Sequence, residues 1–294
     1  MKKYAYYPGC SLEKIASSYH KSTLETTRVF DIDLQELDDW NCCGATTYFH
    51  VDGILAHTLV ARNLALAEKE GLDLVAPCSA CYKNAYFTNK YLQEDPDLAE
   101  HINFALEEDD LQFNGKIEVF HLIEVFANEV GPEKLKEKVT NPLKGLNIAP
   151  YYGCQIARPR KNGEEVENPQ YFEELIEATG ATSSYFPERL RCCGGTLIMT
   201  NRIAALSMVR ILLESAEKNG ADVIATACPM CQVNLECYQN AVNEEFGTKF
   251  HLPILYFTQL FGIALGISPK KLGFGVEMVS AKPIFKKLLS KEAN

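Results

Sequence analysis

The motifs that organise this sequence are CCG at residues 42–44 and CSAC at residues 78–81, which return 150 positions later as CCG at 192–194 and CPMC at 228–231. A further cysteine precedes each CCG, within YYPGC at residues 6–10 and YYGC at residues 151–154. Self-similarity over such distances indicates an internal duplication. We therefore treat the chain as two copies of one unit.

The two copies are predicted to form two tandem homologous domains. Between Gly131 and Gly145 the sequence is polar, charged and closed by a proline, which is typical of a linker. We accordingly predict domains at residues 1–138 and 139–294. The second ends in a basic tail from Ser268 onward, with six lysines against two glutamates. We expect this tail to be solvated.

Short apolar or alternating runs predict four β-strands in each half, and the segments between them have helical spacing. The predicted strands are Tyr4–Tyr7, Leu34–Leu37, Leu74–Ala76 and Ile117–Phe120, then Leu146–Ala149, Ser184–Phe186, Val223–Thr226 and Ile254–Tyr256. Strands that alternate with helices indicate parallel pairing. The expected fold class is α/β, with each domain a small parallel sheet flanked by helices.

Each cysteine group directly follows a predicted strand. Parallel sheets place their ligands at the carboxyl edge, so five sulfurs in each half are expected to converge there. Ten of the eleven cysteines belong to these two sets: Cys10, Cys42, Cys43, Cys78 and Cys81 in the first, and Cys154, Cys192, Cys193, Cys228 and Cys231 in the second.

Composition narrows the classes of function. The chain has 294 residues, 47% hydrophobic and 23% charged, which is typical of a well-cored globular protein. Its net charge of −10 argues against a nucleic-acid partner. The amino terminus lacks the apolar run of a secretory signal, and the longest apolar stretch, residues 252–267, is shorter than the roughly 20 residues that span a bilayer. We therefore expect a cytoplasmic protein without a transmembrane segment.

Sulfur-only ligand sets without patterned histidines suit iron–sulfur clusters or zinc. Structural zinc takes four ligands, and so does an ordinary cubane cluster. Five cysteines in each set therefore point to a cluster of unusual shape in which one thiolate bridges two irons. A spare fifth cysteine is the alternative.

The doubled pattern of one cysteine, a CCG and a Cys-x-x-Cys resembles the CCG domain family. A pair of such domains without a ferredoxin segment is similar to the group that includes the B-type subunit of the heterodisulfide reductases of methanogenic archaea. This resemblance covers nearly the whole chain. It implies two non-cubane [4Fe-4S] clusters, one bound by each of the two cysteine sets.

The resemblance also implies a reaction and partners. The substrate would be the disulfide of coenzyme M and coenzyme B, which two clusters could hold between them while each supplies one electron. Electrons would arrive through a ferredoxin-like subunit and a flavin-bearing subunit of the same reductase, with a hydrogenase as a further candidate partner. Catalytic groups other than the cluster ligands are not implied.

Two other classes of function stay open. CCG domains also serve as electron-transfer or docking subunits of succinate, lactate, glycolate and glycerol-3-phosphate oxidoreductases. The third class is a zinc-stabilised scaffold with no redox role. The completeness of both cysteine sets favours the disulfide-reducing subunit.

Several residues near the motifs have simpler interpretations. Cys237 has no counterpart in the first half and is expected to be a buried thiol. His121 is expected to pack or to cap a helix, because the equivalent place in the second half is Phe257. Solvated surface charge is the simplest interpretation for the nearby cations, which are Lys83, Arg158, Arg189 and Arg191.

Overall fold

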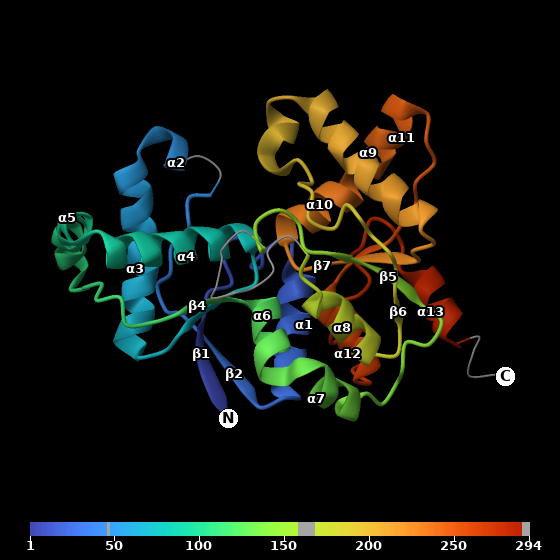
Figure 1. Cartoon of the computed structure of the whole chain (residues 1–294), viewed down its shortest axis with the longest axis horizontal. Coiled ribbons are helices and arrows are strands. Elements are labelled where there is room, and N and C mark those ends of the chain that lie inside the picture. Colours follow the sequence, from blue (N-terminus) through green and yellow to red (C-terminus); the bar gives the residue numbers. More distant parts are fainter. Residues whose placement is uncertain (46–47, 158–167, 290–294) are drawn as a thin grey trace.

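The chain folds around two sheets, each built from one half of the sequence (Figure 1). A computed structural model describes residues 1–45, 48–157 and 168–289. Both sheets have four strands, and every neighbouring pair is parallel. This confirms the predicted α/β class.

In the first half, helices connect successive strands. The strands are β1 (Lys2–Tyr6), β2 (Ile32–Glu36), β3 (Leu74–Ala76) and β4 (Val119–His121). The helical segments are α1 (Ser17–Arg28), α2 (Tyr48–Val51), α3 (Gly53–Glu70), α4 (Ser79–Glu94), α5 (Pro96–Leu106), η1 (Glu107–Asp109), α6 (Leu122–Val125), η2 (Phe126–Val130) and α7 (Gly131–Lys138). Two of these helices begin at an aspartate, Asp52 for α3 and Asp95 for α5, whose side chain accepts a backbone N–H of the first turn.

The second half repeats this order of strands and helices. Its strands are β5 (Asn147–Tyr151), β6 (Thr182–Ser183), β7 (Val223–Thr226) and β8 (Ile254–Tyr256). Its helical segments are α8 (Tyr171–Ala178), η3 (Gly195–Met199), α9 (Arg202–Lys218), α10 (Pro229–Cys237), α11 (Gln239–Phe246), α12 (Phe257–Ala264) and α13 (Lys282–Leu289). The strand orders β2-β1-β3-β4 and β6-β5-β7-β8 are equivalent, so the duplication seen in the sequence is also a duplication of topology.

Most predicted strands agree with the structure within a few residues, and three coincide with it, namely Leu74–Ala76, Val223–Thr226 and Ile254–Tyr256. The prediction at Ser184–Phe186 is wrong, because β6 spans Thr182–Ser183. Only Asn147 and Ile148 of β5 pair with this short strand. Phe186 then turns into the core, with 2% of its surface exposed. Its hydrophobic character therefore reflects burial after the strand rather than pairing within it.

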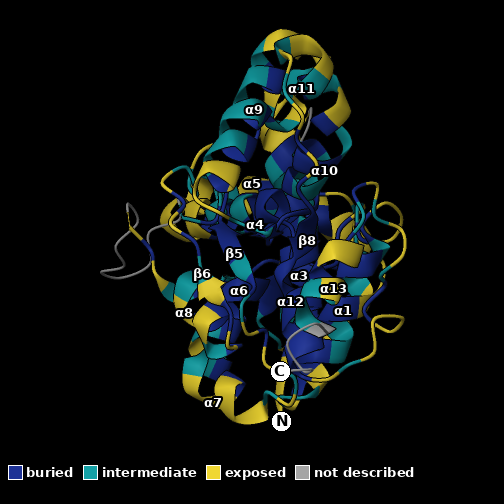
Figure 2. Cartoon of the chain, turned by 90° about the vertical axis from the view of Figure 1, so that its right-hand side faces the viewer, coloured by how far each residue is buried: buried dark blue, intermediate teal, exposed yellow. Residues whose placement is uncertain are grey.

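Helices α1 and α12 pack against each other where the two halves meet (Figure 1). Tyr19 of α1 stacks on Tyr256 at the end of β8, with ring centroids 4.2 Å apart and planes 3° from parallel. Beside them the hydroxyls of Ser22 and Thr258 form a buried hydrogen bond of 2.6 Å. The buried residues follow the strands and the helices around them, whereas α7 and α11 present exposed faces (Figure 2). The two halves thus share a hydrophobic core.

The basic tail packs on the body of the protein, contrary to the expectation of a solvated segment. Ile284 of α13 is 2% exposed. Phe285 packs edge-on against Phe274 within the tail, and Lys287 forms an ion pair with Asp222 of the body. Apolar residues on one side of α13 explain why the lysines do not keep this segment in solvent.

Replacing Phe257 by alanine tests the shared core. Phe257 is fully buried and packs edge-on against Tyr19, Phe126 and Phe172. We expect the F257A variant to lose about 3–5 kcal/mol of unfolding free energy. Both halves should still unfold in a single transition during anaerobic urea denaturation. The matched control is F104A, because Phe104 is 75% exposed and should change stability by no more than about 0.5 kcal/mol. Two separate transitions would contradict a shared core.

Candidate metal centre

The ten paired cysteines all lie at the carboxyl edges of the two sheets. In the first half, Cys10 follows β1, Cys42 and Cys43 follow β2, and Cys78 and Cys81 lie at the start of α4, just after β3. In the second half, Cys154 follows β5, Cys192 and Cys193 follow β6, and Cys228 and Cys231 lie at the start of α10, just after β7. Parallel strands place these loops together, as the sequence predicts.

The first set of sulfurs forms a group of neighbours in contact. Cys43 Sγ lies 3.4 Å from Cys81 Sγ. The Cys42 sulfur is hydrogen-bonded to Cys10 and Cys43, and Cys81 is hydrogen-bonded to Cys78. Cys43, Cys78 and Cys81 are buried, whereas Cys10 and Cys42 are exposed. The group therefore runs from the interior to the surface.

The second set repeats this arrangement. Cys193 Sγ lies 3.6 Å from Cys231 Sγ, and Cys192 and Cys228 extend the group on either side through hydrogen bonds. Cys154 joins the other four cysteines of this set in lining one small cavity. Cys154 and Cys192 are half-buried, so this set is less open than the first.

The two sets meet at Cys78 and Cys228, whose thiols lie close enough across the junction between the halves to shift each other's pKa. A cavity of about 50 Å³ at the second set is lined by its five cysteines and also by Ser79 and Ala80 of the first half. The two candidate centres therefore face each other at a common junction.

Hydrogen bonds from neighbouring thiols favour the thiolate form of one cysteine in each half. The pKa of Cys42 lies well below its usual range because Cys10, and then Cys43, donate to its sulfur. The pKa of Cys228 is also lowered, chiefly because the Cys231 thiol donates to it. Thiolates are the form of cysteine that binds metals. The pKa values of Cys10 and Cys43 in the first set, and of Cys193 and Cys231 in the second, are raised instead, chiefly by hydrogen bonds to neighbouring sulfurs.

A tyrosine hydroxyl holds the loop before each CCG. Tyr7 donates to the carbonyl of Asn41 at 2.8 Å, and Tyr151 donates to the carbonyl of Arg191 at 2.7 Å. The strand register makes Tyr7 the counterpart of Tyr151. Aligning the YY pair at residues 6–7 with the YY pair at residues 151–152 would instead match Tyr7 with Tyr152, one residue too far along the chain. The tyrosines were visible in the repeat, but their role depends on contacts with a distant loop.

An asparagine fixes the backbone of each second CCG cysteine. Asn84 Nδ2 donates to the carbonyl of Cys43, and Asn234 Nδ2 donates to the carbonyl of Cys193, both at 3.1 Å. Both asparagines are buried. The sequence analysis did not identify these asparagines. Each lies three residues after its Cys-x-x-Cys motif, so a comparison of the two halves that continued past the motif would have found them.

Glycine is required where the first loop of each half passes the sulfurs. Gly9 and Gly153 have φ angles of 72° and 73°. A Cβ at Gly9 would lie 3.0 Å from Cys81 Sγ, and one at Gly153 would lie 3.3 Å from Cys231 Sγ. The backbone therefore approaches the sulfurs more closely than a side chain would allow.

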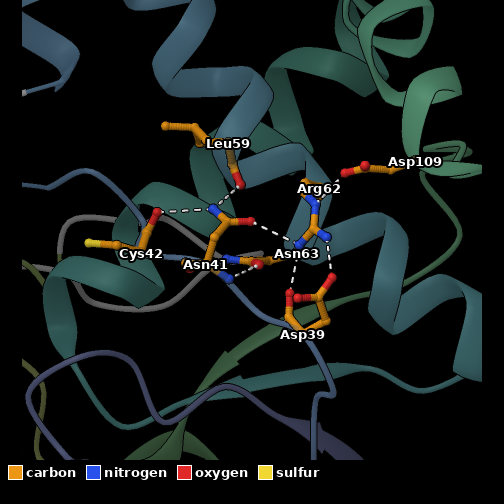
Figure 3. A network of polar contacts seen from close by, with 7 residues as sticks. All are labelled: Asp39, Asn41, Cys42, Leu59, Arg62, Asn63 and Asp109. Carbon is orange, nitrogen blue, oxygen red and sulfur yellow. Dashed lines mark hydrogen bonds and ion pairs between the residues drawn. The ribbon is translucent and has the colours of Figure 1, made fainter.

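An amide network holds the first CCG loop (Figure 3). Asn63 of α3 accepts from the backbone N–H of Asn41 at 3.0 Å and donates to its carbonyl at 2.8 Å. The Asn41 side chain in turn donates to the carbonyls of Cys42 and Leu59. In the second half the position of Asn63 is occupied by Ile211, which cannot form these bonds.

Arg62, which precedes Asn63 on α3, also anchors this loop (Figure 3). It donates to the Asp39 carbonyl at 2.6 Å, pairs with the Asp39 carboxylate, and donates from Nε to Asp109 at 2.6 Å. Its counterpart in the second half, Arg210, instead lies 4.0 Å from Glu214. The network in Figure 3 therefore belongs to the first site.

His121 caps a helix, which confirms one of the two roles expected for it. Its Nδ1 accepts from the backbone N–H of Ile123, while Glu124 accepts from the His121 N–H. The prediction that Phe257 occupies the position equivalent to His121 is wrong by one residue. His121 and Tyr256 end equivalent strands, and Tyr256 is likewise the N-cap residue of the helix that follows, where its backbone N–H donates to Gln259.

The cations near the motifs have varied surroundings. Lys83 lies over the Phe49 ring at 5.7 Å. Arg189 forms an ion pair with Glu173 at 3.0 Å, and its side chain is only 15% exposed. It is therefore not the solvated surface charge that we expected. Arg191 is exposed, as expected. Arg158 lies outside the described residues.

The donor chemistry of the two sets fits iron–sulfur clusters. Each set supplies five cysteines, of which three are buried, and crowded thiolates need a cation to offset their repulsion. Within the described residues, no three His, Cys, Asp or Glu side chains are arranged to hold a single metal ion. The eleventh cysteine, Cys237, which we expected to be a buried thiol, is half-buried at the end of α10, and burial raises its pKa.

Comparison with known proteins places the chain in a family. The cysteine-rich CCG domain matches residues 4–84 and again residues 148–236. The chain therefore belongs to the CCG family. None of its described helices has the length and apolar character needed to cross a membrane.

Individual relatives are similar over nearly their whole length. The chain is 36% identical, over 93% of its length and 92% of the relative, to the B-type subunit of the ferredoxin/F(420)H(2)-dependent CoB-CoM heterodisulfide reductase of Methanosarcina acetivorans. It is also 36% identical, over 95% of its length and 98% of the relative, to the 8-methylmenaquinol:fumarate reductase membrane anchor subunit of Wolinella succinogenes. A hypothetical protein from Helicobacter pylori shares the fold, with a TM-score of 0.77 at 17% identity over 95% of this chain and 52% of that one.

These similarities support an oxidoreductase-associated subunit with iron–sulfur chemistry. They also imply partner subunits, because the named relatives are subunits of larger complexes.

Replacing Arg62 by methionine tests whether its network holds the first loop. Loss of three charge-assisted contacts should lower the unfolding free energy by about 1.5–3 kcal/mol, measured by urea denaturation. The matched control is R210M, which removes an i,i+4 pair with Glu214 and a cation–π contact with Phe246 and should change stability by no more than about 1 kcal/mol. Equal effects of the two variants would contradict the assigned role.

Proposed function

We propose that this chain is the catalytic subunit of a heterodisulfide reductase and reduces the coenzyme M–coenzyme B disulfide to two thiols. One non-cubane [4Fe-4S] cluster in each of the domains 1–138 and 139–294 would be held by the ten paired cysteines. The chain would act in the cytoplasm with a ferredoxin-like subunit and a flavin-bearing subunit of the reductase. A hydrogenase is a further candidate partner.

One observation supports this proposal above the others, namely that one cavity is lined by the cysteines of the second set and by Ser79 and Ala80, which lie between the first-set ligands Cys78 and Cys81. It brings the two cysteine sets together at the junction of the halves, where a single substrate could reach both. A disulfide has two sulfurs and needs two electrons for its reduction. Two facing sites therefore match the stoichiometry of the reaction.

At this junction the residues of the chain would control solvent access and hold the ligand loops in place. When bound, the clusters would supply electrons one at a time. The exposed Cys10 and Cys42 leave the first site open to solvent, whereas the buried Cys43 and Cys81 exclude water from its interior. Tyr7 and the network in Figure 3 hold the loops so that the ligand geometry is set before substrate binds.

A second candidate function rests on the Wolinella relative. That protein is named as a membrane anchor subunit of a quinol:fumarate reductase, and it is as similar to this chain as the methanogen subunit is. On this alternative the two sites would pass electrons between partner subunits or to a quinone, without reducing a disulfide.

The two candidates predict different reactions. We expect the anaerobically purified chain, reduced by an artificial one-electron donor, to be reoxidised by the coenzyme M–coenzyme B disulfide with release of two thiols. Stopped-flow absorbance and a thiol assay would measure this. Reoxidation by a menaquinone analogue but not by the disulfide would favour the alternative. The control is metal analysis: a colourless protein with stoichiometric zinc would contradict both candidates.

Serine at one CCG cysteine of each half tests whether the sites act together. C42S and C192S should each abolish disulfide reduction, while the iron content falls to about half if each half holds one cluster. The control is C237S, which alters a thiol outside both sets and should retain iron and activity. A C42S or C192S variant that loses its iron but turns over normally would refute cooperation between the sites.

A further inference from the structure

Ser79 of the first half reaches into the site of the second half. It follows Cys78 at the start of α4 and is 3% exposed. Together with Ala80 it lines the cavity that also contains Cys154, Cys192 and Cys231. A polar side chain of one half is thus built into the other half's sulfur site.

The Ser79 hydroxyl is one of the buried side-chain groups in the described part of the chain that have no hydrogen-bond partner at ordinary distance and angle. The residue begins α4, but the helix has no side-chain capping bond at this end. The Cys228 sulfur of the second site lies beside the Ser79 side chain. Burial of such a group without a partner is unfavourable, so a sulfur acceptor at the second site would satisfy it.

The duplication provides an internal comparison for this residue. The position of Ser79 in CSAC is occupied by Pro229 in CPMC, and proline has neither a side-chain hydroxyl nor a backbone N–H. The hydrogen bond that Ser79 can give to the second site therefore has no side-chain counterpart at the first.

We propose that the Ser79 hydroxyl donates a hydrogen bond across the junction to a sulfur of the second site and thereby raises the reduction potential of that site. The inference rests on the proposed iron–sulfur function. Hydrogen bonds to ligand or cluster sulfurs stabilise the more negative, reduced state, so they shift the potential upward. Ser79 is on this view a positioning and tuning residue, and it makes two sites with the same ligands inequivalent.

The test is a redox titration of the full chain, followed by electron paramagnetic resonance. The C42S and C192S variants assign each signal to the first or the second site. In S79A, the signal of the second site should shift to a more negative midpoint potential, while that of the first site stays in place. S79T retains a hydroxyl and should restore the wild-type potential.

The control and the contrary outcomes separate this inference from the proposed function. Ser184 is a buried serine of the second half that does not line the cysteine cavity, so S184A should leave both potentials unchanged. An unchanged second signal in S79A, or equal shifts of both signals, would overturn the role of Ser79 alone. Absence of iron and of any signal in the wild-type protein would instead overturn the proposed function.

Discussion

The crowding of sulfur atoms at the edge of two parallel sheets is the constraint on which the rest of this structure depends. Thiolates held this close repel one another strongly where water is excluded, so the arrangement needs protons shared between sulfurs or a bound cation. The surrounding structure keeps the loops from relieving that repulsion by moving apart. Gly9 and Gly153 let the backbone pass close to the sulfurs, and a tyrosine and an asparagine in each half fix the CCG loop.

Much of this arrangement could be predicted from the sequence, because the duplication and the period of the hydrophobic residues are local signals. The residue ranges of β3, β7 and β8 agree with the prediction at both ends, and placing cysteines after strands brought both sets to the correct edge. The failures come from tertiary packing. Phe186 is hydrophobic because it is buried beyond β6, and α13 is covered despite its lysines.

The positioning residues were harder to find for the same reason. Nothing local connects Arg62 with Asp39 and Asp109, since each lies more than twenty residues from it in the sequence. Ser79 occupies a spacer position in its motif, and its importance became visible only when the structure placed it in the cavity of the other half. Patterns of cysteine therefore identify ligands well, while the residues that distinguish two similar sites depend on contacts between the halves.

The pairing of α1 with α12 also has a consequence for biosynthesis. The buried face of α1 is complete after residue 28, but α12 begins only at residue 257. At a synthesis rate of about 5–20 residues per second, α1 waits on the order of ten to fifty seconds for its partner. During that time the ring of Tyr19 and its polar neighbours are exposed and can contact other nascent chains on the same polysome. A chaperone that covers α1 until translation ends would protect such a chain from these contacts.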